Sequence, residues 1–223
     1  MLSFNKLVVF ASTAFLIVGC STNYVKPQNY MAFLPDYSQL KKVEMQSKND
    51  ALVWSKDNVQ QYSKVIYTPI RYSNLESDTQ NTANISQDAR KEILNYTNTQ
   101  IQNALGQHFT LTNQADKKTL IFQGTISKIS TDAKHLKPYE YLPIMLVKAS
   151  TQYALGSRDR DTEIYFEGKF LDASSKQPVY EVVMKVQGKP LENDKSQLSV
   201  ADVKKAIDGL ASDIASFKTN AGG

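Results

Sequence analysis

An apolar run near the N-terminus limits which part of this chain can form a folded domain. Residues 7–18 are apolar apart from Ser12 and Thr13, and Lys6 precedes them. The run is too short to cross a membrane as a helix, which needs about 20 apolar residues, but it has the length of the hydrophobic region of a secretory signal. The alternative, a core strand or buried helix, fits less well beside a lysine and a polar stretch. We therefore expect residues 1–19 to be a signal peptide.

The end of this run resembles the lipobox of bacterial lipoproteins. Ile17, Val18, Gly19 and Cys20 match its order of a branched aliphatic, a small or β-branched residue, a small residue and cysteine. The resemblance implies cleavage between Gly19 and Cys20 and acylation of the Cys20 thiol. One acyl chain binds a membrane only marginally, whereas two or more make the anchor stable. Ser21 stands where lipoproteins of the inner membrane typically carry Asp, so the resemblance also implies the outer membrane. We expect the domain on the periplasmic face of that membrane.

Composition restricts the kind of domain and partner. Removing residues 1–19 leaves 204 of the 223 residues, enough for one domain with a substantial core. Cys20 is the only cysteine, so no disulfide is expected once it is acylated. The formal net charge of +4 comes from interspersed charges without a basic block, which argues against a nucleic-acid partner. The only histidines, His108 and His135, lack metal-ligand spacing, so we expect no metal and no cofactor.

Hydrophobic periodicity predicts a single α+β domain with a mixed or mostly antiparallel sheet, covered by two main helices. The helices are expected at residues 86–106 and 199–218. Ser86 suits the N-cap of the first helix and Gly106 the position after its end, and Ser199 followed by Asp202 resembles a capping box. Strands are expected at 51–54, 65–72, 109–112 and 120–129, and as an antiparallel hairpin at 163–171 and 179–186.

Polar stretches set the expected limits of the domain. Residues 20–30 are predicted to be a tether, residues 31–218 the domain, and residues 219–223 a disordered tail. Within the domain, a Pro35-Asp36 turn signal lies between apolar residues, so this segment is expected to pack onto the domain. Pro69 has no N–H and should lie at the edge or end of a strand.

The apolar stretch at residues 139–155 has two interpretations. It can be a short helix or extended piece that covers the core. It can also be an exposed apolar surface that meets a membrane or a partner, in particular over residues 142–155. It is too short and too interrupted to span a bilayer.

The chain also resembles an uncharacterised family of Gram-negative lipoproteins. Residues 33–40, Phe-Leu-Pro-Asp-Tyr-Ser-Gln-Leu, look like the FLxDYSxL signature of that family. Further similarities are the short strand at 51–54, Leu142-Pro143 followed by an aliphatic run, and a hairpin followed by a C-terminal helix. The resemblance implies an α+β domain related to envelope domains such as the N-terminal domain of TolB. It implies no activity and no catalytic residues.

These observations favour a non-catalytic protein of the cell envelope. No nucleotide, metalloprotease or serine-hydrolase motif is present, and the sequence alone does not bring the carboxylates Asp132, Glu140, Asp159 and Asp161 together. We expect no catalytic site, a lipid bilayer bound through Cys20, and an envelope protein as partner. The alternative is a module that binds a small ligand or lipid in a cavity lined by the apolar segment 142–155; an enzyme is the third possibility.

Overall fold

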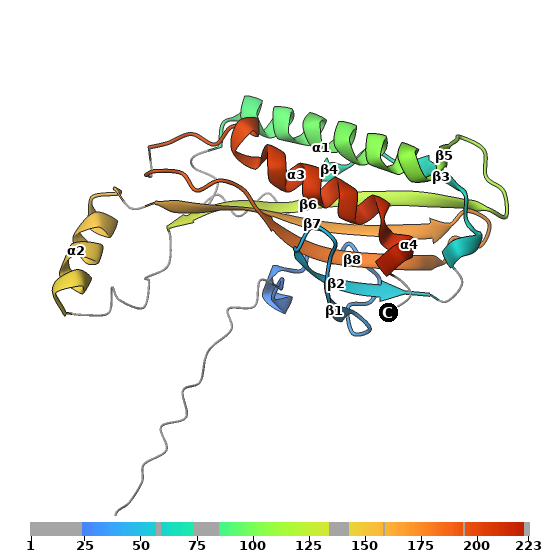
Figure 1. The fold of residues 1–223 in the computed structure, drawn as a ribbon, viewed down its shortest axis with the longest axis horizontal. Helices are drawn as coiled ribbons and strands as arrows, with labels where there is room; N and C mark the ends of the chain where they lie inside the picture. Colours follow the sequence, from blue (N-terminus) through green and yellow to red (C-terminus); the bar gives the residue numbers. More distant parts are fainter. Residues whose placement is uncertain are drawn as a thin grey trace, which may run out of the picture.

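One mixed sheet organises the part of the chain that the structure describes. The structure is a computed structural model, and it describes residues 24–56, 59–73, 85–133, 143–157, 159–193 and 195–220. Eight strands form the sheet, and the two long helices α1 and α3 lie side by side on one of its faces (Figure 1). This arrangement confirms the predicted single α+β domain. The strands are β1 (Lys41–Glu44), β2 (Asp50–Ser55), β3 (Lys64–Tyr67), β4 (Arg71–Tyr72), β5 (Thr110–Leu111), β6 (Thr119–Ala133), β7 (Arg160–Asp172) and β8 (Pro178–Gln187).

The strand order is β1-β2-β8-β7-β6-β3-β5, and β4 pairs with β6 beyond the end of β3. The pairs from β1 to β6 are antiparallel, whereas β3 and β4 run parallel to β6 and β3 runs parallel to β5. The predicted β7–β8 hairpin is therefore confirmed. The single strand expected at 65–72 is divided into β3 and β4, because Pro69 lies between them and cannot donate to a ladder.

Both main helices are present, with ends that differ from the predicted ones. Helix α1 spans Gln87–His108 and begins at Ser86, whose hydroxyl accepts a hydrogen bond from the Ala89 amide. Gly106 lies inside α1 and does not end it, because the apolar stripe continues to the buried Phe109, whose amide still bonds to the Leu105 carbonyl.

Helix α3 spans Val200–Ala215 and begins with the predicted capping box of Ser199 and Asp202. The helix is interrupted at Ser216, and a short α4 (Phe217–Asn220) follows. Buried Asp213 of α3 accepts hydrogen bonds from the Ser47 amide, at 3.0 Å, and from the Asn49 side chain, at 3.3 Å. Helix α3 is thereby tied to the β1–β2 connection.

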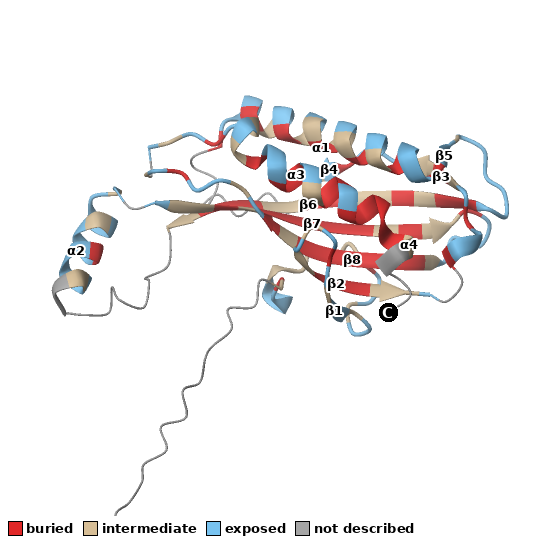
Figure 2. Ribbon diagram, in the orientation of Figure 1, coloured by how far each residue is buried: buried red, intermediate tan, exposed pale blue. Residues whose placement is uncertain are grey.

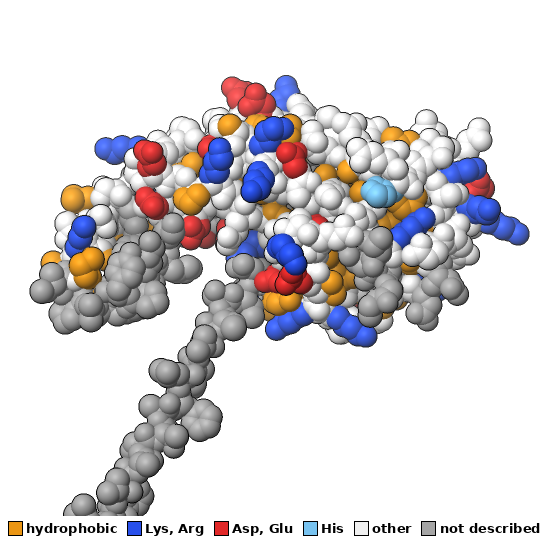
Figure 3. Space-filling model, in the orientation of Figure 1, with side chains coloured by type: hydrophobic (Ala, Val, Ile, Leu, Met, Phe, Trp, Pro, Cys, Tyr) orange, Lys and Arg blue, Asp and Glu red, His pale blue; other side chains and the backbone are white. Residues whose placement is uncertain are grey.

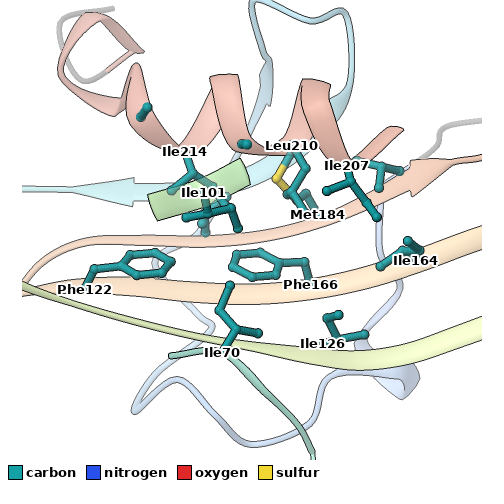
Figure 4. Close-up of a cluster of buried hydrophobic side chains, with 14 of the residues drawn as sticks. Ile70, Ile101, Phe122, Ile126, Ile164, Phe166, Met184, Ile207, Leu210 and Ile214 are labelled. Carbon is teal, nitrogen blue, oxygen red and sulfur yellow. The ribbon is translucent and has the colours of Figure 1, made fainter. Parts of the chain in front are cut away.

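The main core lies between the helices and the sheet, as the buried colouring in Figure 2 shows. In Figure 4, Phe122 and Phe166 lie beneath Ile214 and Leu210 of α3. Gly124 and Gly168 are opposite each other on β6 and β7, and a Cβ at either would come within 2.8 Å of the Phe166 ring. The two glycines therefore leave the space that this ring fills.

The opposite face of the sheet is covered by residues 24–40, which we call the strap. Val25 and Leu34 of the strap are buried against Leu52 of β2, Tyr165 of β7 and Val183 of β8. Packing against the sheet therefore already includes Tyr24 and Val25, which lie before the boundary predicted between residues 30 and 31. The apolar and aromatic residues among the polar ones of this segment make it part of the domain.

Candidate functional site

An open groove of about 560 Å³ lies on the strap side of the sheet. It has the size of an ordinary ligand pocket, about 300–1,000 Å³. Three segments line it: the strap at Met31, Ala32 and Phe33, the β3–β4 region at Thr68, Pro69, Arg71, Tyr72 and Ser73, and β6 at Gln123, Gly124 and Thr125.

The strap wall of the groove is held by Tyr37. Its hydroxyl accepts hydrogen bonds from the amides of Phe33 (3.0 Å) and Leu34 (3.3 Å) and donates one to Glu167 Oε2 at 2.5 Å. The ring of Tyr37 also stacks on Tyr30, with 4.4 Å between the ring centroids. This one side chain therefore closes a loop in the strap and fastens the loop to strand β7.

Glu167 is the buried acceptor at the centre of this contact. Its side chain is fully buried under the strap, and its Oε1 accepts a hydrogen bond from the Met31 amide at 2.8 Å. Burial raises the pKa of the Glu167 carboxyl, although the hydrogen bonds from Tyr37 and Met31 oppose this shift. The carboxylate thus depends on the strap for the donors that replace water.

Lys169 adds a second contact between β7 and the strap. Its ammonium donates to the Phe33 carbonyl at 2.9 Å and lies 4.5 Å from the centre of the Phe33 ring. Burial lowers the pKa of Lys169, while the nearby carboxylates of Glu181 and Glu167 act in the opposite direction. Phe33, which lines the groove, is therefore held by both its backbone and its ring.

The opposite wall is positioned from helix α1. The Asn98 side chain accepts a hydrogen bond from the Ile70 amide at 2.7 Å and donates one to the Ile70 carbonyl at 3.1 Å. On the β6 side, the Thr125 hydroxyl donates to the Arg71 carbonyl at 3.0 Å. The chain on both sides of Ile70 is thereby fixed. Arg71 and Thr125 are register partners and lie on the same face as the strap.

The groove combines apolar surface with amide, hydroxyl and guanidinium groups. Met31, Phe33 and Pro69 provide the apolar part, and Arg71 provides a positive charge beside Gln123 and Thr125. Such a lining can hold a chain segment or small molecule that has both apolar and hydrogen-bonding parts.

The apolar segment predicted at 139–155 contributes helix α2 (Pro143–Ala154), which lies beyond the ends of β6 and β7 (Figure 1). Five large hydrophobic side chains are exposed among the described residues, and four of them are Leu146, Val147, Tyr153 and Leu155. Neither hydrophobic cluster of the described residues includes α2. The core-covering interpretation is therefore wrong, and the exposed apolar surface is confirmed for this helix.

The structure places the other predicted residues as follows. Gly19, Cys20, His135 and Glu140 lie outside the described residues. His108 is exposed at the last turn of α1. Asp132 and Asp161 are register partners on β6 and β7, so the fold brings these two carboxylates together.

The residues that the structure describes contain neither a metal-ion cluster nor a membrane-spanning helix. Among them, no group of three or more His, Cys, Asp and Glu side chains is arranged to hold a metal ion. No helix among them combines the length and the apolar character that crossing a membrane requires.

The contacts of Tyr37 and Glu167 were not predicted from the sequence. Residues 33–40 were expected to pack onto the domain, which is confirmed, but no partner for Tyr37 was named. Glu167 lies at a polar position of an alternating strand, where solvent exposure is the ordinary expectation. Tyr165 and Val183 lie on the same face of the sheet as Glu167. These neighbouring apolar side chains are the only sequence signal that another segment covers Glu167.

Comparison with known proteins places the chain in a family. The "Uncharacterized lipoprotein YdcL" of Escherichia coli K12 is 34% identical over 204 residues, which cover 91% of this chain and 90% of the relative. Solved structures to which the chain is similar include XCC0632 from Xanthomonas campestris (12% identity, TM-score 0.43, covering 72% of this chain and 86% of that chain). Another is the PelC dodecamer from Paraburkholderia phytofirmans (11% identity, TM-score 0.35, covering 73% and 96%). These two likenesses are too distant to support a statement about function.

The family model described as "Protein of unknown function (DUF3313)" matches residues 29–214. This match and the relative from Escherichia coli confirm the resemblance to an uncharacterised lipoprotein family. The chain is a member of the DUF3313 family.

Proposed function

We propose that this protein is a lipoprotein of the outer membrane, anchored by acylated Cys20, whose periplasmic domain is non-catalytic and acts by binding an envelope partner. The observation that carries the proposal is the fastening of the strap to the sheet. Tyr24 packs beside the sheet and follows Cys20 by only four residues. Four extended residues span at most about 14 Å. The anchor would therefore hold the domain close to the membrane surface in a restricted orientation.

A restricted orientation suits an interaction protein, because the domain then presents the same part of its surface to a partner at a similar distance from the membrane. The Tyr37–Glu167 and Lys169–Phe33 contacts hold the strap along the sheet, so the groove beside the strap keeps its place relative to the anchor. The groove is open and combines apolar and polar groups, which suits a segment of a partner protein.

Anchoring is tested with Cys20→Ala. We expect the wild-type protein to incorporate labelled palmitate and to band with outer-membrane vesicles in a density gradient. The variant should incorporate none and should accumulate as precursor or soluble protein. Normal palmitate incorporation in the variant would contradict the lipoprotein assignment, and wild-type protein in the inner-membrane band would contradict the location.

Partner binding is tested with a photo-crosslinking amino acid at Thr68, which is exposed and lines the groove. The matched control carries it at Gln102, which is exposed on α1 on the other side of the sheet. We expect one reproducible protein adduct from Thr68 in intact cells and none from Gln102. Absence of a Thr68 adduct, or the same adducts from both positions, would count against a partner in the groove.

The groove also supports the second candidate, a module that binds a small ligand or lipid. The cavity of about 560 Å³ favours this candidate, although its lining contains no residue of α2, the apolar segment that first suggested it. Native mass spectrometry of protein extracted from membranes separates the two candidates. A discrete bound molecule that is lost in Arg71→Ala would favour the ligand-binding module over the partner protein.

A further inference from the structure

We propose that helix α2 is a membrane-contacting element that lies in the headgroup region of the leaflet holding Cys20. The inference rests on the proposed anchor and adds a second, non-covalent contact with the same membrane. It starts from the uneven distribution of exposed apolar side chains, of which four of five in the described residues lie at 146–155. Val147 is 67% exposed, Tyr153 69% and Leu155 72%.

Helix α2 carries a single charged side chain. Lys148 is the only charged residue of Pro143–Ala154. Ser150 and Thr151, which are exposed on the same helix, donate their hydroxyl hydrogens to the Val147 carbonyl at 2.9 and 2.8 Å. Their polar hydrogens are therefore used within the helix. A helix with Leu, Val and Tyr side chains outward and a single lysine suits the interface, where the lysine ammonium can remain in water.

The position of α2 brings it toward the membrane. In Figure 1, α2 extends beyond β6 and β7 at the level of the strap, away from the side that carries α1 and α3. The strap begins at Tyr24, which lies within about 14 Å of the bilayer-bound Cys20 if the three intervening residues are extended. The anchor and α2 are thus on the same side of the molecule, and Figure 3 shows hydrophobic side chains on this projecting part.

The alternative occupant is a second copy of this chain, and two observations favour lipid. The anchor places every molecule at a bilayer whether or not another copy is near. Leu146 and Val147 are consecutive in the helix and therefore point about 100° apart, which suits a fluid surface more than a fitted protein face. Asp132 and Asp161 lie where β6 and β7 project toward α2, and their negative charges would repel anionic lipid. Electrostatic attraction to such lipid therefore does not drive the contact. The contact should therefore be apolar and insensitive to lipid charge.

The test uses the complete acylated protein, reconstituted in vesicles of phosphatidylcholine with or without phosphatidylglycerol. Acylation uses the only natural thiol, so a cysteine introduced as Val147→Cys or Tyr153→Cys takes a single environment-sensitive fluorophore. Gln102→Cys on α1 is the matched control, because it is exposed on the opposite side of the sheet. Quenchers attached at different depths of the lipid chains report how far the fluorophore enters, and flotation reports anchoring separately.

We expect blue-shifted emission and quenching at a depth of about 5–10 Å below the headgroups for both α2 positions. The Gln102 fluorophore should remain in water, and the α2 signal should be the same in both vesicle compositions. Anchored protein with water-exposed α2 fluorophores would overturn this inference and leave the proposed anchor intact. Protection without lipid quenching, together with crosslinks between copies, would overturn it in favour of self-association. Protein that neither floats nor shows a shift would overturn both proposals.

Discussion

The hydroxyl of Tyr37 offers the sharpest test of how the strap is held. Tyr37→Phe keeps the ring that stacks on Tyr30 but removes the 2.5 Å hydrogen bond to Glu167 and the acceptor for the Phe33 and Leu34 amides. A hydrogen bond to a buried charged group contributes about 1.5–3 kcal/mol. We expect the variant to lower the free energy of strap opening by about 2 kcal/mol, which corresponds to about 30-fold faster exchange of strap amides.

Hydrogen exchange of the peptide that contains the Met31 amide measures strap opening directly, and urea unfolding measures the whole domain. Tyr153→Phe is the matched control, since it removes an exposed hydroxyl, and it should change stability by less than about 0.5 kcal/mol. In a Glu167→Gln background, the cost of Tyr37→Phe should fall to about 1 kcal/mol because the acceptor is neutral. A cost below about 0.5 kcal/mol, or an equal cost in both backgrounds, would refute the assignment of Glu167 as the partner that fastens the strap.

Three further substitutions and one pH dependence provide additional tests. Gly124→Ala puts a Cβ 2.8 Å from the Phe166 ring and should cost about 1–3 kcal/mol in urea unfolding. Gly106→Ala, whose Cβ meets no atom beyond the helix's own backbone closer than 3.6 Å, should instead gain about 0.5–1 kcal/mol; a gain for Gly124→Ala or a cost for Gly106→Ala would contradict the corresponding prediction. Asp213→Ala removes a buried acceptor that joins α3 to the β1–β2 connection and should cost about 3 kcal/mol; an unchanged unfolding midpoint would argue against that role. Burial raises the pKa of Glu167, so the folded state binds this proton more tightly than the unfolded state. The free energy of unfolding of the wild type relative to Glu167→Gln should therefore fall as the pH rises from the ordinary carboxyl range through the raised pKa. If the two proteins instead gave parallel curves of unfolding free energy against pH, a raised pKa of Glu167 would be excluded.

Local signals in the sequence were sufficient for the helices and the hairpin. Val203, Ile207, Leu210 and Ile214 recur at helical spacing along α3 and are all buried, because helical spacing alone decides which side chains share a face. Strand β1 was not predicted, since its Lys-Lys-Val-Glu sequence has no apolar alternation and becomes a strand only by pairing with β2 at the edge of the sheet. Charged residues at such an edge also discourage pairing with another chain.

The candidate site depended on contacts between distant segments, which the sequence does not specify. Alternation along β7 assigns Glu167 to the face opposite Phe166, but it does not say what covers that face. The cover is the strap, and the Tyr37–Glu167 contact joins positions 130 residues apart. The two walls of the groove come from equally separate segments, near Met31 and near Arg71, so neither the groove nor its lining could be predicted from the sequence.

The strap also accounts for the exposure of α2. In the described part of the chain, α1 and α3 cover one face of the sheet and the strap covers the other, so each face of the central strands already has an apolar partner. Helix α2 follows β6 and precedes β7, and it has no remaining sheet surface there on which to bury Val147 and Tyr153. A helix this apolar gains free energy by leaving water at about 25 cal/mol per Å² of apolar surface. Since α2 belongs to neither hydrophobic cluster of the described residues, that gain requires another surface, and the one that the proposed anchor provides is the membrane itself.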